Sequence, residues 1–494
     1  MKDQMGKIIF VNPPSMDSAY AELREFALAV PPLGMAYIAA YLESYNNDVE
    51  IVDCDALRLD IPQAVNLIKN KHPKYIGLMA MTSTMTIVTK MFKLLRVSLP
   101  DAILVLGGVH GTALPKRTLE EVPEIDFIVM GEGEYTTHEL ITKYENNETS
   151  LEDLKSIKGI GFRHDNSIYI NERRPLIDDL DSLPFPARHL LPMEVYNGPG
   201  WFRWFKGYVK PFVSVFTTRG CPFNCNFCAS HLMSERKVRQ RSIENVMAEI
   251  DHLVETYNIK VLCFQDDTFT MNRKRTIELC TQLSSRDYDL RIMCSTRVNQ
   301  VDEELLMYMK KAGVEWMFYG VESGNEEVLK RCNKRITLSQ IRRAYDITRK
   351  AGICTHAGII LGHIGETKET ALDSIRFLRD LNSDYAAIAT LVPFPGSYAW
   401  DYCQENKIPL PKDWCDFGMV NSMPIAVNPG LSSADLLILR DKGIFSYNAN
   451  PNRLLRMFTD KRYNKKLMIY DHFYNAYALL LRKIRLTREV LVNS

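Results

Sequence analysis

Three cysteines stand close together in one short segment, as Cys221, Cys225 and Cys228 with the spacing C-x3-C-x2-C. Iron–sulfur clusters are usually held by four thiolates, so a [4Fe–4S] cluster held by these three would keep one iron open to another ligand. An open iron can bind a substrate or a cofactor. The spacing therefore predicts a reactive metal centre rather than a closed structural one.

Other uses of closely spaced cysteines must be considered. His231 lies three residues after Cys228 and could complete a Cys3His zinc site, although the loop would be cramped. The chain has 11 cysteines, an odd number, and we recognise no signal peptide, so we expect a reducing cytoplasm and no disulfides. Cys332, Cys403 and Cys415 could meet around an auxiliary cluster, and most other cysteines are expected to be buried small hydrophobes.

The cysteine segment resembles the signature of radical S-adenosylmethionine (SAM) enzymes, C-x3-C-x-aromatic-C, with Phe227 at the aromatic position. This resemblance implies that the open iron chelates the amino and carboxylate groups of SAM. An electron from the cluster would then cleave the C5′–S bond to give a 5′-deoxyadenosyl radical. It also implies an electron donor such as a flavodoxin or a ferredoxin, and anaerobic conditions.

Length and composition indicate a soluble enzyme of several domains. The 494 residues suggest about three domains of ~150 residues, and the 46% hydrophobic content permits large cores. The net charge of +1 gives no overall attraction to nucleic acid or to an anionic membrane, so we expect no nucleic-acid partner. No apolar run of about 18 residues is present, and we therefore expect no membrane span.

Strand and helix patterns alternate through residues 1–150. Apolar strand segments are expected at residues 7–11, 49–53, 75–79, 102–106 and 125–129, with helical periodicity at 34–45, 61–70 and 87–99. This order predicts an α/β domain with a doubly wound, Rossmann- or flavodoxin-like parallel sheet. Such sheets bind ligands beyond the carboxyl ends of their strands, here the loops at 12–14, 82–86 and 107–112.

Three segments of this domain, at residues 31–40, 106–113 and 129–134, resemble the cobalamin-binding domain that one class of radical SAM enzymes carries. The resemblance implies a cobalamin site that includes Asn12, Pro13, Pro14, Leu33, Gly34, Thr82, Ser83, Gly107, Gly108, His110, Gly131 and Glu132. The motif D-x-H-x-x-G, whose histidine coordinates cobalt in many such domains, is missing. The domain therefore either binds cobalamin without that ligand or binds none. His110 is either a cobalt ligand or a hydrogen-bonding loop residue.

The second half of the chain repeats the strand–helix pattern. A linker is expected at residues 151–205, with a small hairpin at 157–162 and 167–171, followed by about six β/α units at 206–400. These units predict a partial (β/α)6 barrel similar to a TIM barrel, with its active site at the carboxyl ends of the strands and the cysteines after its first strand. Residues 401–494 are expected to form a mainly helical domain.

Several residues near strand ends take roles by resemblance to the radical SAM family. Gln265, Asp266 and Asp267 would receive the amino end of SAM, whereas Ser295 and Arg297 would hold its carboxylate, which suits a bidentate guanidinium. Glu322 and Ser323 would lie near the ribose or methionine, and Ile360 and Gly362 would flank the adenine. Each carboxylate could instead form an ion pair at the rim of the barrel.

Two further regions could contact a substrate. Residues 201–208 form an aromatic and basic run, and residues 453–488 hold ten basic against two acidic residues among many aromatic and apolar ones. The second region is either a basic surface for lipid head groups or an anionic substrate, or a helical cap with a solvated basic face. Tyr319 and Tyr385 could gate a substrate.

The family resemblance implies that methylcobalamin gives a methyl group to a carbon radical of a small-molecule, lipid or peptide substrate. A radical cyclisation, rearrangement or carbon–carbon bond formation without methyl transfer, with or without bound cobalamin, is the alternative. A noncatalytic metal-binding scaffold is the remaining hypothesis.

Overall fold

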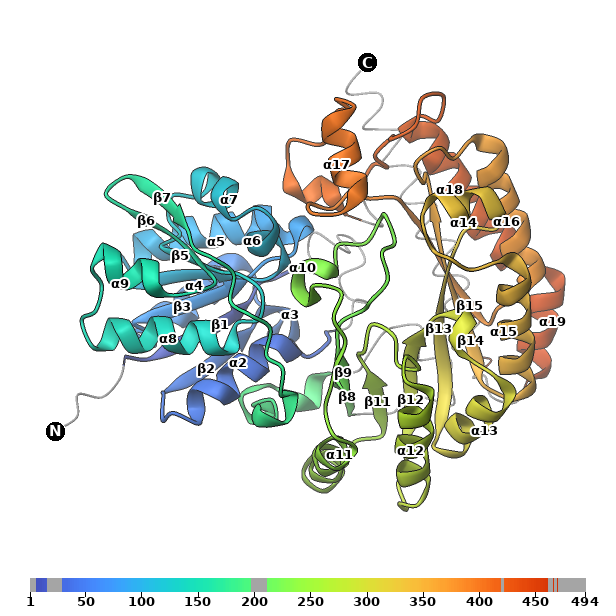
Figure 1. The fold of residues 1–494 in the computed structure, drawn as a ribbon, viewed down its shortest axis with the longest axis horizontal. Helices are drawn as coiled ribbons and strands as arrows, with labels where there is room; N and C mark the ends of the chain where they lie inside the picture. The colour runs from blue at the N-terminus through green and yellow to red at the C-terminus, as the bar shows by residue number, and fades with distance from the viewer. Residues whose placement is uncertain are drawn as a thin grey trace.

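Two sheets, one after the other along the chain, organise the protein (Figure 1). The computed structural model describes residues 6–15, 29–196, 211–418, 422–460, 465 and 469. The aromatic run at 201–208 and nearly all of the basic region after residue 460 lie outside these residues.

The first sheet has seven strands in the order β2-β1-β3-β4-β5-β6-β7, and β1 to β5 are parallel. The strands are β1 (Ile8–Asn12), β2 (Val49–Asp53), β3 (Tyr75–Met79), β4 (Ile103–Gly107), β5 (Phe127–Val129), β6 (Ile160–His164) and β7 (Ser167–Ile170). The order 2-1-3-4-5 is the flavodoxin-like arrangement, in which the topological switch point lies between β1 and β3. The predicted doubly wound domain is therefore confirmed.

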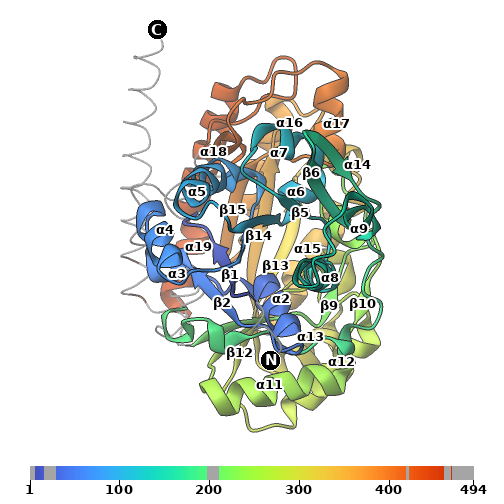
Figure 2. The same ribbon diagram turned by 90° about the vertical axis from the view of Figure 1, so that its left-hand side faces the viewer.

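Alternation of side chains along the strands decides which helices cover each face. Ile8 and Phe10 share one hydrophobic core with α2 (Leu33–Glu43). Tyr75 of β3 and Ile141 of α8 (Glu134–Glu145) belong to the same core. Ile9 and Val11 face the opposite core. That core includes α4 (Ile61–Lys69) and α5 (Met85–Ser98), which lie on the other side of the strands in Figure 2. Successive β residues point to opposite faces, so one strand serves both layers.

The predicted hairpin of the linker forms as β6 and β7. It extends the first sheet, because β6 pairs with β5 in the antiparallel sense. The first sheet thus continues beyond residue 150. The remaining helices of this part are α3 (Cys54–Leu57), α6 (Val109–Ala113), α7 (Pro115–Glu121) and α9 (Leu151–Ser156).

The second sheet has six parallel strands in the order β15-β14-β13-β12-β11-β8, and it curves without closing. The strands are β8 (Phe212–Val215), β11 (Val261–Phe264), β12 (Arg291–Thr296), β13 (Val314–Glu322), β14 (Cys354–Leu361) and β15 (Tyr385–Thr390). The helices between them are α11 (Ile243–Tyr257), α12 (Arg273–Ser284), α13 (Glu303–Lys311), α14 (Glu326–Arg331), α15 (Leu338–Lys350) and α16 (Lys368–Leu381). This is the predicted partial barrel.

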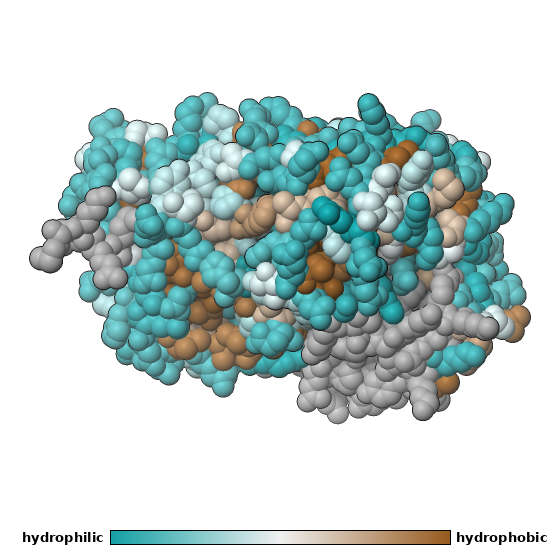
Figure 3. All heavy atoms as spheres, turned by 90° about the horizontal axis from the view of Figure 1, so that it is seen from below, coloured by the Kyte–Doolittle hydropathy of each residue, from teal (hydrophilic) through white to brown (hydrophobic). Residues whose placement is uncertain are grey.

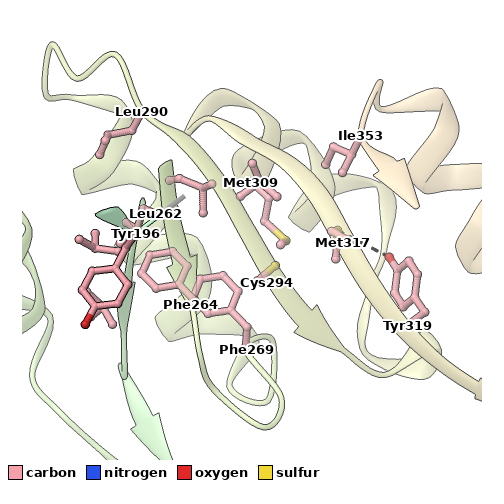
Figure 4. Packing of buried hydrophobic residues seen from close by; sticks show 14 of the residues in the cluster. Tyr196, Leu262, Phe264, Phe269, Leu290, Cys294, Met309, Met317, Tyr319 and Ile353 are labelled. Carbon is pink, nitrogen blue, oxygen red and sulfur yellow. Dashed lines mark hydrogen bonds between the residues drawn. The ribbon is translucent and has the colours of Figure 1, made fainter. Parts of the chain in front are cut away.

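Alternate residues of these strands point to the helices or into the barrel. Leu262, Phe264, Cys294 and Met317 pack outward with Met309 of α13 (Figure 4). Tyr319 belongs to this outer core, is fully buried, and hydrogen-bonds Thr348 at 2.7 Å. Tyr319 therefore does not face the barrel interior, where a substrate gate would have to lie.

Inward residues at the amino ends of the strands form a separate cluster. Phe212, Val261, Met293, Trp316 and Cys354 pack there with Met457 of α19 (Pro451–Thr459). A C-terminal helix thus closes this end of the barrel. Tyr385 is half-buried beside the cluster, with its ring 4.6 Å from that of His356.

The C-terminal segment joins the two sheets. It contains α17 (Tyr398–Glu405), the 3-10 turn η8 (Trp414–Phe417) and α18 (Ser433–Asn448), and α17 lies above both domains in Figure 1. Trp400, Trp414 and Phe417 share a core with the first sheet, and the Trp414 indole nitrogen donates to Glu121 at 2.8 Å. Among the described residues up to 460, the predicted helical character of the C-terminal part is confirmed, and this segment packs as a bridge between the domains.

In the described part of the chain, no helix is both long enough and apolar enough to cross a membrane. The face shown in Figure 3 is mainly hydrophilic, with apolar residues in separate small patches.

Candidate active site

A cavity of about 470 Å³ lies between the two domains. The first domain contributes loops at the carboxyl edge of its sheet, and the second contributes Thr218, Gly220, Gln265 and Asp267 near the start of its barrel. The wall is mostly apolar. A group held by the first sheet in this cavity would face the segment that carries the cysteines.

Glycines shape the first-domain wall. No atom lies within 4 Å of the position that a Cβ would take at Gly34 or Gly131, and at Gly107 the nearest is a backbone oxygen at 3.9 Å. Side chains here would project into open space that belongs to the cavity. Gly108 has a φ of +93°, and a Cβ there would approach Ala80 O to 2.7 Å, so only glycine fits. This cradle fits a broad, flat cofactor such as a corrinoid.

The cavity continues inward as an apolar arm. Ile8, Phe10 and Tyr75 line it on the sheet side, and Leu140 and Ile141 line it on the side of α8. An apolar or aromatic extension of a cofactor would be buried there between the sheet and its helix layer.

Only part of the predicted cobalamin set lines this cavity. Gly34, Gly107, Gly108, Gly131 and Glu132 do so. The others lie elsewhere. Asn12 donates to Asp53 at 2.8 Å, and Leu33 packs against Ile177 and Leu180. The buried Pro13 and Pro14 and the 3-10 turn with Thr82 and Ser83 are also not among the lining residues.

His110 points away from the cavity. Its ring is fully buried with its edge against Trp414, the ring centroids being 4.6 Å apart, and Nδ1 lies 3.4 Å from the Thr82 hydroxyl. Burial lowers the pKa of His110 to about 4, so the imidazole is neutral. This position gives His110 a packing role at the C-terminal bridge and no access to a cofactor in the cavity.

Glu132 is committed to the interface of the two domains. It accepts hydrogen bonds from Arg219 at 2.8 Å, Arg239 at 2.6 Å and the backbone N–H of Ile177 at 2.9 Å. Burial opposes its ionisation, but Arg239 and Arg219 outweigh burial and hold the pKa of Glu132 below its usual value. Glu132 thus lines the cavity and ties the two domains through its carboxylate.

The cysteine loop follows β8 and β9 (Thr218–Arg219), as predicted. All three thiols are half-buried. Burial raises the pKa of Cys221, against a backbone hydrogen bond from Phe223, and the nearby Asp267, Cys228 and Cys225 raise it further. A cluster spreads its thiolate ligands over separate irons, so neighbouring thiols that do not touch suit it.

Single-ion sites are not formed. In the described ranges, no three His, Cys, Asp or Glu side chains converge closely enough to hold one metal ion. His231 begins the short helix α10 (His231–Ser234) after the loop. A Cys3His zinc site therefore finds no support in this geometry. Of the three cysteines considered for an auxiliary cluster, Cys332 is buried with its thiol toward the Leu329 carbonyl at 3.4 Å, and Cys403 is buried in a hydrophobic core.

Several predicted SAM residues lie at or just beyond the carboxyl ends of the barrel strands. Gln265, Ser295, Arg297 and Ile360 share the parity of the inward cluster at the barrel floor, so they face the interior. The Arg297 guanidinium lies 3.7 Å from the Phe223 ring, and its Nη1 lies 3.7 Å from Cys225 Sγ. Of these four predicted SAM residues, Arg297 contacts the cysteine loop directly.

Three comparisons with known proteins bear on this arrangement. The model of the radical SAM superfamily matches residues 215–378, and the model of the B12 binding domain matches residues 23–141. An uncharacterized methyltransferase of Pyrococcus horikoshii is 32% identical over 91% of this chain and 94% of its own length. The chain belongs to the radical SAM superfamily. Its first domain is a B12-binding domain, and the protein is an enzyme of the radical SAM class.

This radical SAM enzyme has further relatives. An anaerobic magnesium-protoporphyrin IX monomethyl ester cyclase of Rubrivivax gelatinosus is 32% identical over 79% of this chain and 69% of the relative. The fold resembles that of the radical SAM methyltransferase TsrM of Kitasatospora setae, with a TM-score of 0.67, 17% identity, and 88% of both chains covered. It also resembles the cobalamin-dependent enzyme OxsB, with a TM-score of 0.64, 21% identity, and 89% of this chain and 62% of OxsB covered.

Two predicted SAM residues of this radical SAM enzyme have other partners. Asp266 is fully buried and accepts the backbone N–H groups of Thr217 at 2.7 Å and Thr218 at 3.0 Å. Ser323 is also buried, and its hydroxyl lies 2.9 Å from that of Ser374. Both side chains fix strand ends and turn away from the barrel interior.

Lys334 is a site residue that the sequence did not reveal. Its Nζ lies 2.7 Å from Glu322 Oε1 and 6.0 Å from the Phe227 ring, and its carbonyl accepts a hydrogen bond from Arg297. Glu322 has a φ of +65°, a left-handed conformation that is uncommon outside glycine and is often found at functional sites. The only signal in the sequence was a basic residue in the turn after Cys332.

The segment after β14 also packs against the cysteine loop. Gly362 has a φ of +88°, and its N–H donates to the carboxylate of Glu366. Burial raises the pKa of Glu366 to about 7. His363, also buried, lies with its ring 5.4 Å from that of Phe227. This segment therefore packs against the aromatic residue of the cysteine motif.

Proposed function

We propose that this radical SAM enzyme methylates an unactivated carbon of a small organic substrate, with cobalamin in the interdomain cavity and a [4Fe–4S] cluster at Cys221, Cys225 and Cys228. The observation that carries the proposal is the shared cavity. Its walls are the glycine cradle of the B12-binding domain on one side and Gly220, Gln265 and Asp267, beside the cysteine loop, on the other.

Bound at these places, the cluster and SAM would supply a carbon-centred radical, and the corrinoid would supply a methyl group. The chain itself provides orientation. Gln265, Ser295, Arg297 and Ile360 line the interior above the loop and would bind SAM, with Arg297 suited to its carboxylate. Glu322, held by Lys334, would contact its ribose or methionine part.

The remaining predicted residues enter the proposal with different roles. Asp267 is exposed in the cavity wall near Cys221, so it is placed for a polar contact with SAM. Asp266 and Ser323 support the strand ends. In the described part of the first domain no histidine lines the cavity, and His110 is turned toward Trp414.

The test is an anaerobic assay of the reconstituted holoenzyme with SAM that carries a trideuterated methyl group. We expect 5′-deoxyadenosine, S-adenosylhomocysteine and a labelled product when a substrate is supplied with a strong reductant. Failure to form any 5′-deoxyadenosine would refute the radical part, and formation of the labelled product by protein without corrinoid would refute the cobalamin part.

A second candidate reaction is ring closure without methyl transfer. The observation in its favour is the 32% identity to the magnesium-protoporphyrin monomethyl ester cyclase over most of this chain. The same labelled assay separates the two reactions, because a cyclase product would have lost hydrogen and gained no label. In both cases an external one-electron donor, such as a flavodoxin or a ferredoxin, is part of the proposal.

A further inference from the structure

The cysteine loop is most exposed between its first two cysteines. Pro222 and Asn224 stand there and are exposed, whereas the cysteines are half-buried. The part of the loop after Cys225 is held by neighbouring backbone. Asn226 donates to the carbonyls of Cys332 and Arg331, and its own carbonyl accepts from Ala399. An electron that enters from outside the protein therefore has its most open approach at Asn224.

Two basic segments flank this place. Arg236 donates to the Asn224 side chain at 2.7 Å, and Asn333 donates to the Asn224 carbonyl at 2.7 Å. Arg335 in turn donates to Asn333 at 3.1 Å. Segments 235–237 and 330–335, distant in sequence, thus meet at the exposed edge of the loop.

The two segments carry mainly positive charge. Their exposed cations are Arg236, Lys237, Lys330, Arg331 and Arg335, here called the basic rim. The one exposed carboxylate in these segments is Glu235, which pairs with Lys237 at 3.2 Å. Lys334 is buried with Glu322 and does not contribute to the outer field. The chain as a whole has a net charge of only +1, so the rim is a local concentration of positive charge.

We propose that the basic rim is the docking site for an acidic electron-carrier protein, which rests on the function proposed above. A carrier with a negative surface around its redox group would be steered to the rim and held with that group against the loop. One electron then passes from the reduced carrier to the iron–sulfur centre. The carrier is oxidised by one electron, the centre is reduced by one, and no bond or proton is exchanged.

Charge-reversed pairs test the rim. Lys237→Glu with Lys330→Glu changes two rim lysines with exposed side chains, of which Lys237 pairs with Glu235 and Lys330 stands in the last turn of α14. Lys311→Glu with Lys350→Glu is the matched control, because both lysines are exposed last residues of α13 and α15, at the end of the barrel opposite the loop. The two double variants have the same net charge. Each of them also replaces at least one lysine in the last turn of a helix by glutamate.

The probe is a purified acidic flavodoxin, whose affinity for the reconstituted holoenzyme is measured by calorimetry at ionic strengths of about 20 mM and about 150 mM. We expect the rim double to raise Kd at least tenfold at the lower salt, and the control double to change it less than twofold. The rate of cluster bleaching by reduced flavodoxin should fall in parallel. Salt should remove most of the difference.

Dithionite separates this inference from the proposed function. With dithionite in place of flavodoxin, all three proteins should form 5′-deoxyadenosine at equal rates. Equal flavodoxin affinity in the two doubles would overturn the docking site. A rim double that also fails with dithionite would overturn it as well, since the lysines would then act on the cluster. Failure of the parent protein with dithionite would overturn the proposed function alone.

Discussion

Arg219 and Glu132 form an ion pair of 2.8 Å that joins the two domains two residues before the first cysteine. The second guanidinium nitrogen of Arg219 reaches Glu134 at 2.7 Å, and its Cζ lies 4.9 Å from the centre of the Tyr37 ring. The start of the cysteine loop is thereby fixed to the wall of the cavity. The distance between two cofactor sites on different domains depends on this contact.

Arg219→Gln should loosen the interface, because it leaves Glu132 and Glu134 nearly buried with less compensating charge. We expect a loss of about 3 kcal/mol in the free energy of unfolding by urea. Arg343→Gln is the control, since it breaks an exposed ion pair with Glu303 that should contribute less than about 1 kcal/mol. Equal effects of the two substitutions would contradict a special role for the interdomain pair.

Alanine at Cys221, Cys225 or Cys228 should abolish cluster binding, because two thiolates cannot hold a cubane that normally takes four ligands. Iron and sulfide content after anaerobic reconstitution is the measurement. Cys415→Ala removes another half-buried thiol and should leave both contents unchanged. Loss of iron in the Cys415 variant would instead support an auxiliary cluster that includes Cys415.

Side chains of increasing size at Gly34 should progressively exclude a corrinoid. Gly34 is the second residue of α2, faces the cavity, and has open space where a Cβ would stand. Gly34→Ala should retain binding and Gly34→Phe should weaken it about tenfold or more, which corresponds to about 1.4 kcal/mol. Equilibrium dialysis with hydroxocobalamin gives the affinities, and circular dichroism checks the fold. Unchanged affinity in the Phe variant would place the corrinoid elsewhere.

Glu366 should make stability depend on pH. Burial raises its pKa from the usual 4.5 to about 7, so the folded protein holds a proton there that the unfolded chain has released. Its contribution therefore lowers stability as pH rises from about 4.5 to 7, by about 3 kcal/mol in total. The stability of Glu366→Gln relative to the parent protein should therefore increase as pH rises across this window.

The measurement is the difference in unfolding free energy between Glu366→Gln and the parent at several pH values, which cancels the titration of other groups. His363, for example, has its pKa lowered by burial to about 4 and acts with the opposite sign in both proteins. A difference that stays constant between pH 5 and about 8 would show that Glu366 is already ionised in the folded state.

The sequence by itself determined the classes of structure and the metal-binding loop. Apolar strands that alternate with helical segments can form only a few layered α/β arrangements, and both sheets followed. The spacing of Cys221, Cys225 and Cys228 is a local property, so it survives any tertiary context. Gln265, Ser295 and Arg297 were named by resemblance to the radical SAM family, and the alternation of side chains along their strands places them toward the interior.

Tertiary structure decided what each polar side chain contacts. Asp266 and Asp267 are neighbours in the chain, yet opposite directions along the backbone give Asp266 two backbone N–H partners and leave Asp267 in the cavity wall. His110 follows a glycine pair as a ligand might, but Trp414, some 300 residues later, covers it. Such contacts join residues far apart in sequence, and no local spacing encodes them.

The relation between the domains was likewise beyond the sequence. Nothing in residues 131–134 or 219 alone indicates that Glu132 and Arg219 meet, because either charged side chain would be stable when exposed to solvent. Only the packing of one sheet against the other, bridged by the C-terminal segment, removes that water and brings the two charges together. The cavity between the domains is a consequence of the same packing.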